Sequence, residues 1–383
     1  MGKLAFLPWL SLDAEFEVGD FRLVPYHRGE APGVDAGEQA AIDKVLSAYR
    51  DLHGKPIDRA TVIRHSAQES PSADFSESLH LDFFVFVDLL AFAGLAARRF
   101  FGHFEYTNRD SYRLVLQQFS TPGRGVLVTT RRRDGGTNMF YSGDTFVVYR
   151  PHHVGSDPAK LDEGLLHALV AAMSDEQWPR LYQGVLLFNE ANTDRIEVPQ
   201  GTELIMTYAA LEQLLDSAGR PPAEVARVFS DFLSPREDLE RQAWKVAHGN
   251  DRAQRLLDSV PNLRTAWLLD LGISRGSVAH GHATEAYPAC WQLHEHLLFG
   301  AHVVPLALKR QLHALGYYSM TDDDIGGVEV LEALLNEDHF EYPESDNAER
   351  EKRPWLRIID GERIRRWVHA ATERYPRGGN AAS

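Results

Sequence analysis

A long apolar stripe near the C-terminus constrains the fold more than any other feature. Between residues 293 and 315 apolar side chains recur at steps of four and three, at Leu293, Leu297, Ala301, Val304, Leu308, Leu312 and Leu315. These positions share one face of a helix, and such a face must be buried against other elements. Pro305 is expected to kink this helix without ending it. The stripe therefore predicts a core helix of a helical bundle.

The segments before this stripe are also helical in pattern. Apolar residues recur at i, i+4, i+7 and i+11 from Leu204, and further helices are expected over 224–233, 234–247 and 253–271, the last interrupted at Pro261. A break over 192–201 contains Pro199 and Gly201. We predict an α-helical bundle over residues 199–318, and over 319–383 a helical tail that packs on it.

Residues 1–198 mix strand and helix signals, which makes the expected class α+β. Strands are expected over 17–25 and 79–86, and an antiparallel meander over 112–119, 125–132 and 145–149. Expected helices cover 37–52, 87–101, 162–172 and 176–189. This mixed N-terminal domain carries no motif with evident chemistry.

Composition narrows the class of protein. A chain of 383 residues is long enough for two domains, and its single cysteine, Cys290, excludes a disulfide framework and a cysteine-based zinc cluster, which suits the cytoplasm. A net charge of -15 argues against a protein that coats nucleic acid non-specifically, though not against one local basic cleft. The densest apolar run, 83–97, is interrupted by Asp88, so no membrane partner is expected.

The stretch that carries chemistry is Arg275-Gly-Ser-Val-Ala-His280. An arginine can bind a phosphate through two parallel hydrogen bonds, and a histidine exchanges a proton near neutrality. Gly272, Gly276 and Gly281 are poor helix residues. We therefore expect a helix to begin near Ser274, with that serine as its cap and Arg275 in its first turn.

This stretch resembles the R-x4-6-H motif of the HEPN family (higher eukaryotes and prokaryotes nucleotide-binding domains), many of whose members are ribonucleases. The helix Tyr208-Ala-Ala-Leu-Glu-Gln-Leu-Leu215 is similar to the opening helix of its Apea-like subgroup, and Phe6–Leu10 and Gly19–Pro25 resemble the start of such proteins. The resemblance covers about residues 202–316. It departs at Gly276, where many active members have a polar residue, often Asn.

The resemblance implies a metal-independent endoribonuclease with a composite site at a homodimer interface. Such enzymes act as toxins or antiviral effectors, so the N-terminal domain would sense a phage- or stress-derived trigger. The expected catalytic residues are Arg275 and His280, with Ser274, Ser277, His282 and Asp270 as candidate supporting residues. No cofactor and no metal are expected.

The mechanism of RNA cleavage without metal fits an arginine and a histidine as catalytic residues. A base removes the ribose 2′-OH proton, the oxygen attacks the adjacent phosphorus, and an acid protonates the departing 5′ oxygen. Arg275 would stabilise the charge that develops on the phosphorus, and His280 would move protons. One histidine cannot easily serve as acid and base at once, and a two-fold dimer would supply the second.

Three alternatives stay open. Arg275 could pair with Asp270 or another helix carboxylate while His280 is a core histidine. The bundle could be a non-catalytic dimerisation or sensor module. A metal-dependent hydrolase could use His280, His282, His294 and His296, although histidines two positions apart diverge by about 200° on a helix.

Overall fold

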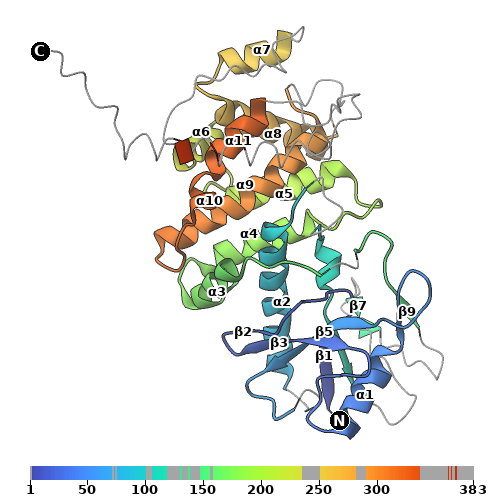
Figure 1. Ribbon diagram of the computed structural model, residues 1–383. Helices are drawn as coiled ribbons and strands as arrows, with labels where there is room; N and C mark the ends of the chain where they lie inside the picture. The colour runs from blue at the N-terminus through green and yellow to red at the C-terminus, as the bar shows by residue number, and fades with distance from the viewer. Residues whose placement is uncertain are drawn as a thin grey trace, which may run out of the picture. The chain divides into compact units, whose positions relative to one another are not determined.

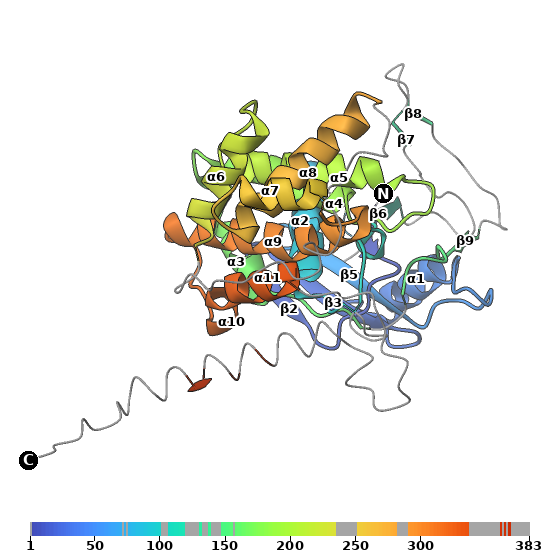
Figure 2. The same cartoon turned by 90° about the horizontal axis from the view of Figure 1, so that it is seen from above.

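The computed structural model describes residues 2–70, 73, 76–100, 106–118, 130–131, 137–138, 147–155, 158–234, 251–281 and 290–336, and positions 361, 364, 367 and 368. The chain forms two compact units. The first comprises Met1–Arg98, Phe104–Ser174 and Asn192–Arg195, and the second comprises Arg99–His103, Asp175–Ala191 and Ile196–Ser383. Figures 1 and 2 show a sheet in the first and helices throughout the second.

A five-stranded antiparallel sheet in the order β2-β3-β5-β1-β6 forms the centre of the first unit (Figure 1). The strands are β1 (Lys3–Leu7), β2 (Phe16–Val18), β3 (Phe21–His27), β5 (Arg59–His65) and β6 (Val115–Gln118). The predicted strand over 17–25 is in fact the β2–β3 hairpin, which turns at Gly19 with φ +54°. A positive φ is favoured by glycine, so this residue fixes the turn.

Three helices accompany the sheet: α1 (Ala36–Leu46), α2 (Glu77–Ala97) and α3 (Glu163–Ala171). The predicted strand over 79–86 is wrong, because those residues form the first half of α2. Ser76 caps that helix by accepting a hydrogen bond from the Leu79 amide at 3.3 Å. A run of apolar residues without alternation fits a buried strand and a buried helix equally, and here the length of the run decides for the helix.

By length and apolar composition, residues Ser78–Ala97 of α2 could also cross a membrane. The core helix of a soluble protein meets the same criteria. Phe83, Phe86, Leu90 and Phe92 of this helix are buried within the protein. Leu81 and Phe84 of the same helix are exposed, so only part of its apolar surface is buried.

The expected meander is only partly present in the described residues. The short strands β7 (Thr130–Arg131) and β8 (Thr137–Asn138) pair antiparallel, and β7 lies within the expected strand 125–132. The flanking segments pair elsewhere: β6 pairs with β1, and β9 (Val148–Tyr149) pairs in parallel with β4 (Tyr49–Arg50). Local strand signals identify strands, but they do not identify partners that lie about 100 residues away in the sequence.

The second unit is all-helical where it is described, and the chain is α+β as expected. Its helices are α4 (Trp178–Glu190), α5 (Gln200–Leu214), α6 (Pro222–Phe232), α7 (Asp251–Asp258), α8 (Leu263–Ala279), α9 (Leu293–Ala314), α10 (Asp322–Ile325) and α11 (Gly327–Asn336). Helix α5 packs against α4, α8 and α9, and α8 also packs against α6 (Figure 1). The predicted long helix is α9, which continues through Pro305. The predicted helix over 234–247 lies almost wholly outside the described residues.

The division into units differs from the expected boundary at residue 198. Helix α4 lies before that boundary in the sequence, yet it belongs to the second unit and packs along α5. Gly184 of α4 explains the fit, since a Cβ at this position would lie 2.8 Å from Leu214 Cδ2 of α5. The described part of the expected tail, α10 and α11, belongs to the same unit, and α11 contacts α8 and α9.

Candidate functional site

The Arg275 motif lies in the last turns of one uninterrupted helix. Helix α8 begins at Leu263, where the Asn262 side chain accepts a hydrogen bond from the Thr265 amide at 2.9 Å, and it ends at Ala279. The predicted helix start at Ser274 is therefore wrong. Gly272 does not break the helix because it allows close packing: a Cβ there would lie 2.9 Å from Tyr208 Cε2 of α5. That contact offsets the roughly 1 kcal/mol by which glycine disfavours a helix.

Arg275 extends from α8 over two residues of α5. Its guanidinium carbon lies 5.6 Å from the centre of the Tyr208 ring, and its Nη2 lies 3.9 Å from Oε2 of Glu212. The arginine side chain is 37% exposed, and within the described residues it donates no hydrogen bond, its Nε included. The ring and the carboxylate flank the guanidinium. Its Nε is buried, and its Nη groups donate no hydrogen bond to any described residue.

Burial shapes the electrostatics around this arginine. Burial raises the pKa of Glu212, and the nearby charge of Arg275 offsets part of that rise. Burial also raises the pKa of Tyr208, whose hydroxyl has no hydrogen-bond partner among the described residues. A carboxyl group with a raised pKa is suited to carrying a proton in mildly acid solution. Glu212 is therefore a second titratable group beside Arg275, and the sequence alone did not single it out.

His280 follows the last residue of α8 and is exposed. Its amide donates to the Gly276 carbonyl at 3.0 Å, and Gly281, with φ +65°, then turns the chain away. The alternative of a core histidine is thus wrong for His280, whereas its other part, a helix carboxylate beside Arg275, is confirmed by Glu212. Five positions on one helix separate two side chains by about 140° and about 7.5 Å of rise. Arg275 contacts α5, whereas His280 is the capping residue beyond the end of α8.

The candidate supporting residues divide into buried and partly buried ones. Asp270 is fully buried, and its Oδ2 accepts hydrogen bonds from the amides of Cys290 at 3.0 Å and Trp291 at 3.2 Å. Ser274 is buried with no hydrogen-bond partner among the described residues, and Ser277 donates to the carbonyl of Ile273 at 3.1 Å. Asp270 and Ser277 are thus engaged in hydrogen bonds within the second unit, and Ser274 is buried there. His282 lies outside the described residues.

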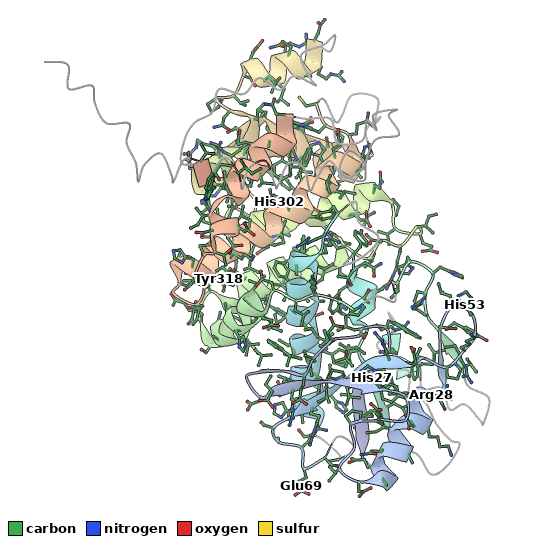
Figure 3. The ribbon with its side chains drawn as sticks, viewed as in Figure 1. His27, Arg28, His53, Glu69, His302 and Tyr318 are labelled. Carbon is green, nitrogen blue, oxygen red and sulfur yellow. The ribbon has the colours of Figure 1, made fainter. Side chains whose placement is uncertain are left out.

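Three histidines of the second unit contact three different partners. His296 is fully buried 3.3 Å from Asp270, His302 lies 2.9 Å from the Gly327 carbonyl (Figure 3), and His313 lies 2.9 Å from the Tyr318 carbonyl. Burial lowers the pKa of His302, which keeps its ring neutral. Among the residues that the structure describes, no three His, Cys, Asp or Glu side chains form a group able to hold a metal ion.

Comparisons with models of protein families, with curated proteins and with solved structures found no match.

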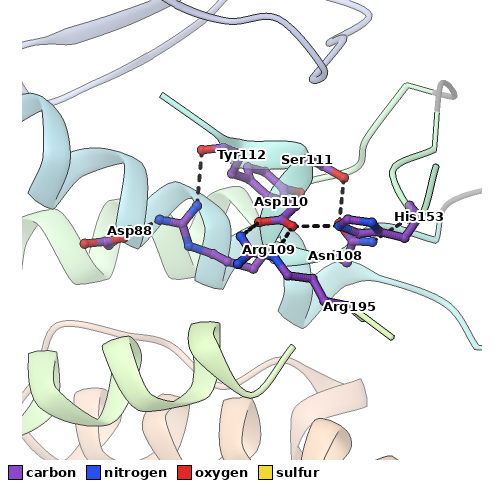
Figure 4. A network of polar contacts seen from close by, with 8 residues as sticks. All are labelled: Asp88, Asn108, Arg109, Asp110, Ser111, Tyr112, His153 and Arg195. Carbon is purple, nitrogen blue, oxygen red and sulfur yellow. Dashed lines mark hydrogen bonds and ion pairs between the residues drawn. The ribbon is translucent and has the colours of Figure 1, made fainter. Parts of the chain in front are cut away.

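The first unit contains a network of hydrogen-bonded charged side chains that no sequence pattern predicted (Figure 4). Asp110 accepts two hydrogen bonds of 2.6 Å from Arg195, and its Oδ2 lies 2.6 Å from His153 Nε2. Burial alone would raise the pKa of Asp110, but Arg195 and His153 outweigh burial and lower it. Arg109 pairs with Asp88 at 2.7 Å in the same network. Since these residues lie up to about 100 positions apart, no local pattern reveals them.

Proposed function

We propose that the protein is a metal-independent endoribonuclease that cleaves RNA through Arg275 and His280. The observation that carries this proposal is the surroundings of Arg275. Its guanidinium lies against Tyr208 and Glu212 and is partly exposed, and it donates no hydrogen bond within the described residues. A phosphate is the ligand that best fits such a guanidinium. The motif's resemblance to HEPN ribonucleases supports the same reading.

In the proposed reaction the ribose 2′-OH loses its proton and attacks the adjacent phosphorus. The bond from phosphorus to the 5′ oxygen breaks, and that oxygen takes up a proton. The products are a 2′,3′-cyclic phosphate and a free 5′-OH. Arg275 would stabilise the charge on the phosphorane oxygens, His280 would transfer a proton, and Glu212 is suited to a second transfer.

Arg275 lies against α5, whereas His280 follows the end of α8, so the proposal takes the two residues from different copies. We propose that Arg275 of one copy works with His280 of another across a two-fold axis, with the C-terminal end of α8 in the interface. Mixing Arg275→Ala and His280→Ala subunits tests this arrangement. Each variant alone should be inactive, and mixed dimers should recover activity because one intact Arg275–His280 pair forms. No recovery in proven mixed dimers would contradict the composite site.

A direct assay tests the activity itself. Purified protein is incubated with labelled RNA with and without EDTA, and the product ends are analysed. We expect cleavage to persist in EDTA and to leave 2′,3′-cyclic phosphate. Arg275→Ala and His280→Ala should abolish it, whereas Arg227→Ala and His27→Ala, which change exposed residues elsewhere, should not. Full activity in His280→Ala would refute the proposal.

A second candidate is a non-catalytic dimerisation or sensor module. One observation that favours it is that α8 continues without a break through Arg275 to Ala279, so His280 lies beyond the helix end. The other is Gly276, which stands where many active members of the HEPN family have a polar residue. Under this alternative a stable dimer forms without RNA cleavage, and Arg275→Ala leaves its association constant unchanged.

A further inference from the structure

A surface of the first unit combines an exposed aromatic ring with two cations. We call it the Tyr149 surface: it consists of Arg50, Tyr149 and the turn Asp51–Lys55. Strand β4 pairs in parallel with β9, and Arg50 is the register partner of Tyr149. The amide of Arg150 then donates to the Arg50 carbonyl at 2.9 Å, which fixes the two segments side by side.

The side chains of Arg50 and Tyr149 share the solvent side of this ladder. Their neighbours Tyr49 and Val148 pack into the core cluster on the opposite side, and successive side chains of a strand alternate between faces. Tyr149 is 62% exposed, although large aromatic rings are usually buried. A Cβ at Gly54 would lie 3.9 Å from Tyr149 Cε1, so the turn borders one edge of the ring.

The Tyr149 surface carries two cations, Arg50 and Lys55, and one carboxylate, Asp51. This excess of one positive charge occurs in a protein of net charge -15. Arg50 and Lys55 form no ion pair within the described residues. The carboxylate of Asp51 accepts hydrogen bonds of 2.8 Å from the amides of His53 and Lys55, so it is committed to the turn. His53 is exposed on the same turn (Figure 3).

We propose that the Tyr149 surface binds single-stranded RNA, with one base stacked on the Tyr149 ring and adjacent phosphates bound by Arg50 and Lys55. Aromatic stacking combined with nearby cations is the general mode by which proteins bind single strands without reading their sequence. Paired bases do not offer a free face to the ring, so duplex RNA should bind more weakly. This surface shares no residue with the Arg275 site, and the inference does not depend on cleavage.

Binding is measured by fluorescence anisotropy with a labelled 12-nucleotide single-stranded RNA and the full-length His280→Ala protein, so that cleavage cannot alter the probe. We expect Tyr149→Ala to weaken binding about tenfold or more, and Tyr149→Phe to retain it, because the ring remains. Arg50→Gln should lower the slope of log Kd against log salt by about 0.7, the value for one phosphate contact to a single strand. Circular dichroism checks that each variant is folded.

Matched controls separate this surface from general charge effects. Phe84 is an exposed ring on α2 and Lys44 an exposed cation on α1, and Phe84→Ala and Lys44→Gln should leave both affinity and salt slope unchanged. Equal affinity of folded Tyr149→Ala and its parent, or the absence of RNA binding by the parent, would overturn the proposal. Poly-glutamate that competes as well as RNA would also overturn it, because the surface would then attract any polyanion.

Discussion

The guanidinium carbon of Arg275 lies 5.6 Å from the centre of the Tyr208 ring. The ring belongs to α5 and the arginine to α8, and the two helices approach closely because Gly272 presents no side chain to Tyr208. This contact sets the direction of the guanidinium before any ligand binds. Preorganised donors lose less freedom when a charged group is bound, so the Tyr208 contact favours binding of an oxyanion.

Arg275→Lys tests whether planar geometry or charge alone matters. Lysine keeps the positive charge but cannot form two parallel hydrogen bonds to a phosphate or lie flat on Tyr208 in the same way. We expect the rate of RNA cleavage to fall about a hundredfold, as for the loss of one donor to a transition-state oxyanion. Single-turnover kinetics measure the change. A rate equal to that of the parent protein would show that a point charge is sufficient.

Glu212→Gln tests the raised pKa of that carboxyl group. A folded-state pKa above the ordinary value of about 4.3 gives stability that is present below that value and is lost as pH rises through the folded pKa. Glutamine does not titrate. The free energy of unfolding of Glu212→Gln relative to the parent should therefore increase as pH rises from about 4 to 7. Urea denaturation at several pH values measures this difference, and a pH-independent difference would contradict the raised pKa.

The sequence predicted some of these features and could not predict others. The apolar steps from Leu293 to Leu315 specify α9, because a stripe that long is incompatible with a strand. The start of α8 was misplaced because glycines suggested a break, whereas Gly272 serves contact with Tyr208. Glu212 could not be assigned to the site, since its position beside Arg275 depends on how α5 packs against α8, which is a relationship between segments about 60 residues apart.

Asp110→Asn tests the polar network of the first unit. The pKa of Asp110 is lowered, so its ionised form contributes stability that is present above the ordinary value of about 3.9 and is lost as pH falls through the folded pKa. Asparagine cannot accept two charge-assisted hydrogen bonds from Arg195. We expect a loss of about 1–2 kcal/mol at pH 7, allowing for the exposure of Arg195, and a smaller loss near pH 3. Chemical denaturation at both values checks the sign.

Arg264 of α8 and Glu332 of α11 form an ion pair of 2.5 Å, with side chains only 4% and 5% exposed. Glu332→Ala removes one partner of this buried ion pair and should lower the free energy of unfolding by about 3–5 kcal/mol. The double variant Arg264→Met, Glu332→Leu removes both charges and retains apolar volume, so its loss should be smaller than that of Glu332→Ala. Arg227→Ala together with Asp231→Ala, an exposed pair on α6, is the matched control and should cost less than about 1 kcal/mol. Thermal and urea unfolding of the four proteins measure these differences. If the double variant is less stable than Glu332→Ala, the ion pair itself is net stabilising, and the desolvation argument fails at this position.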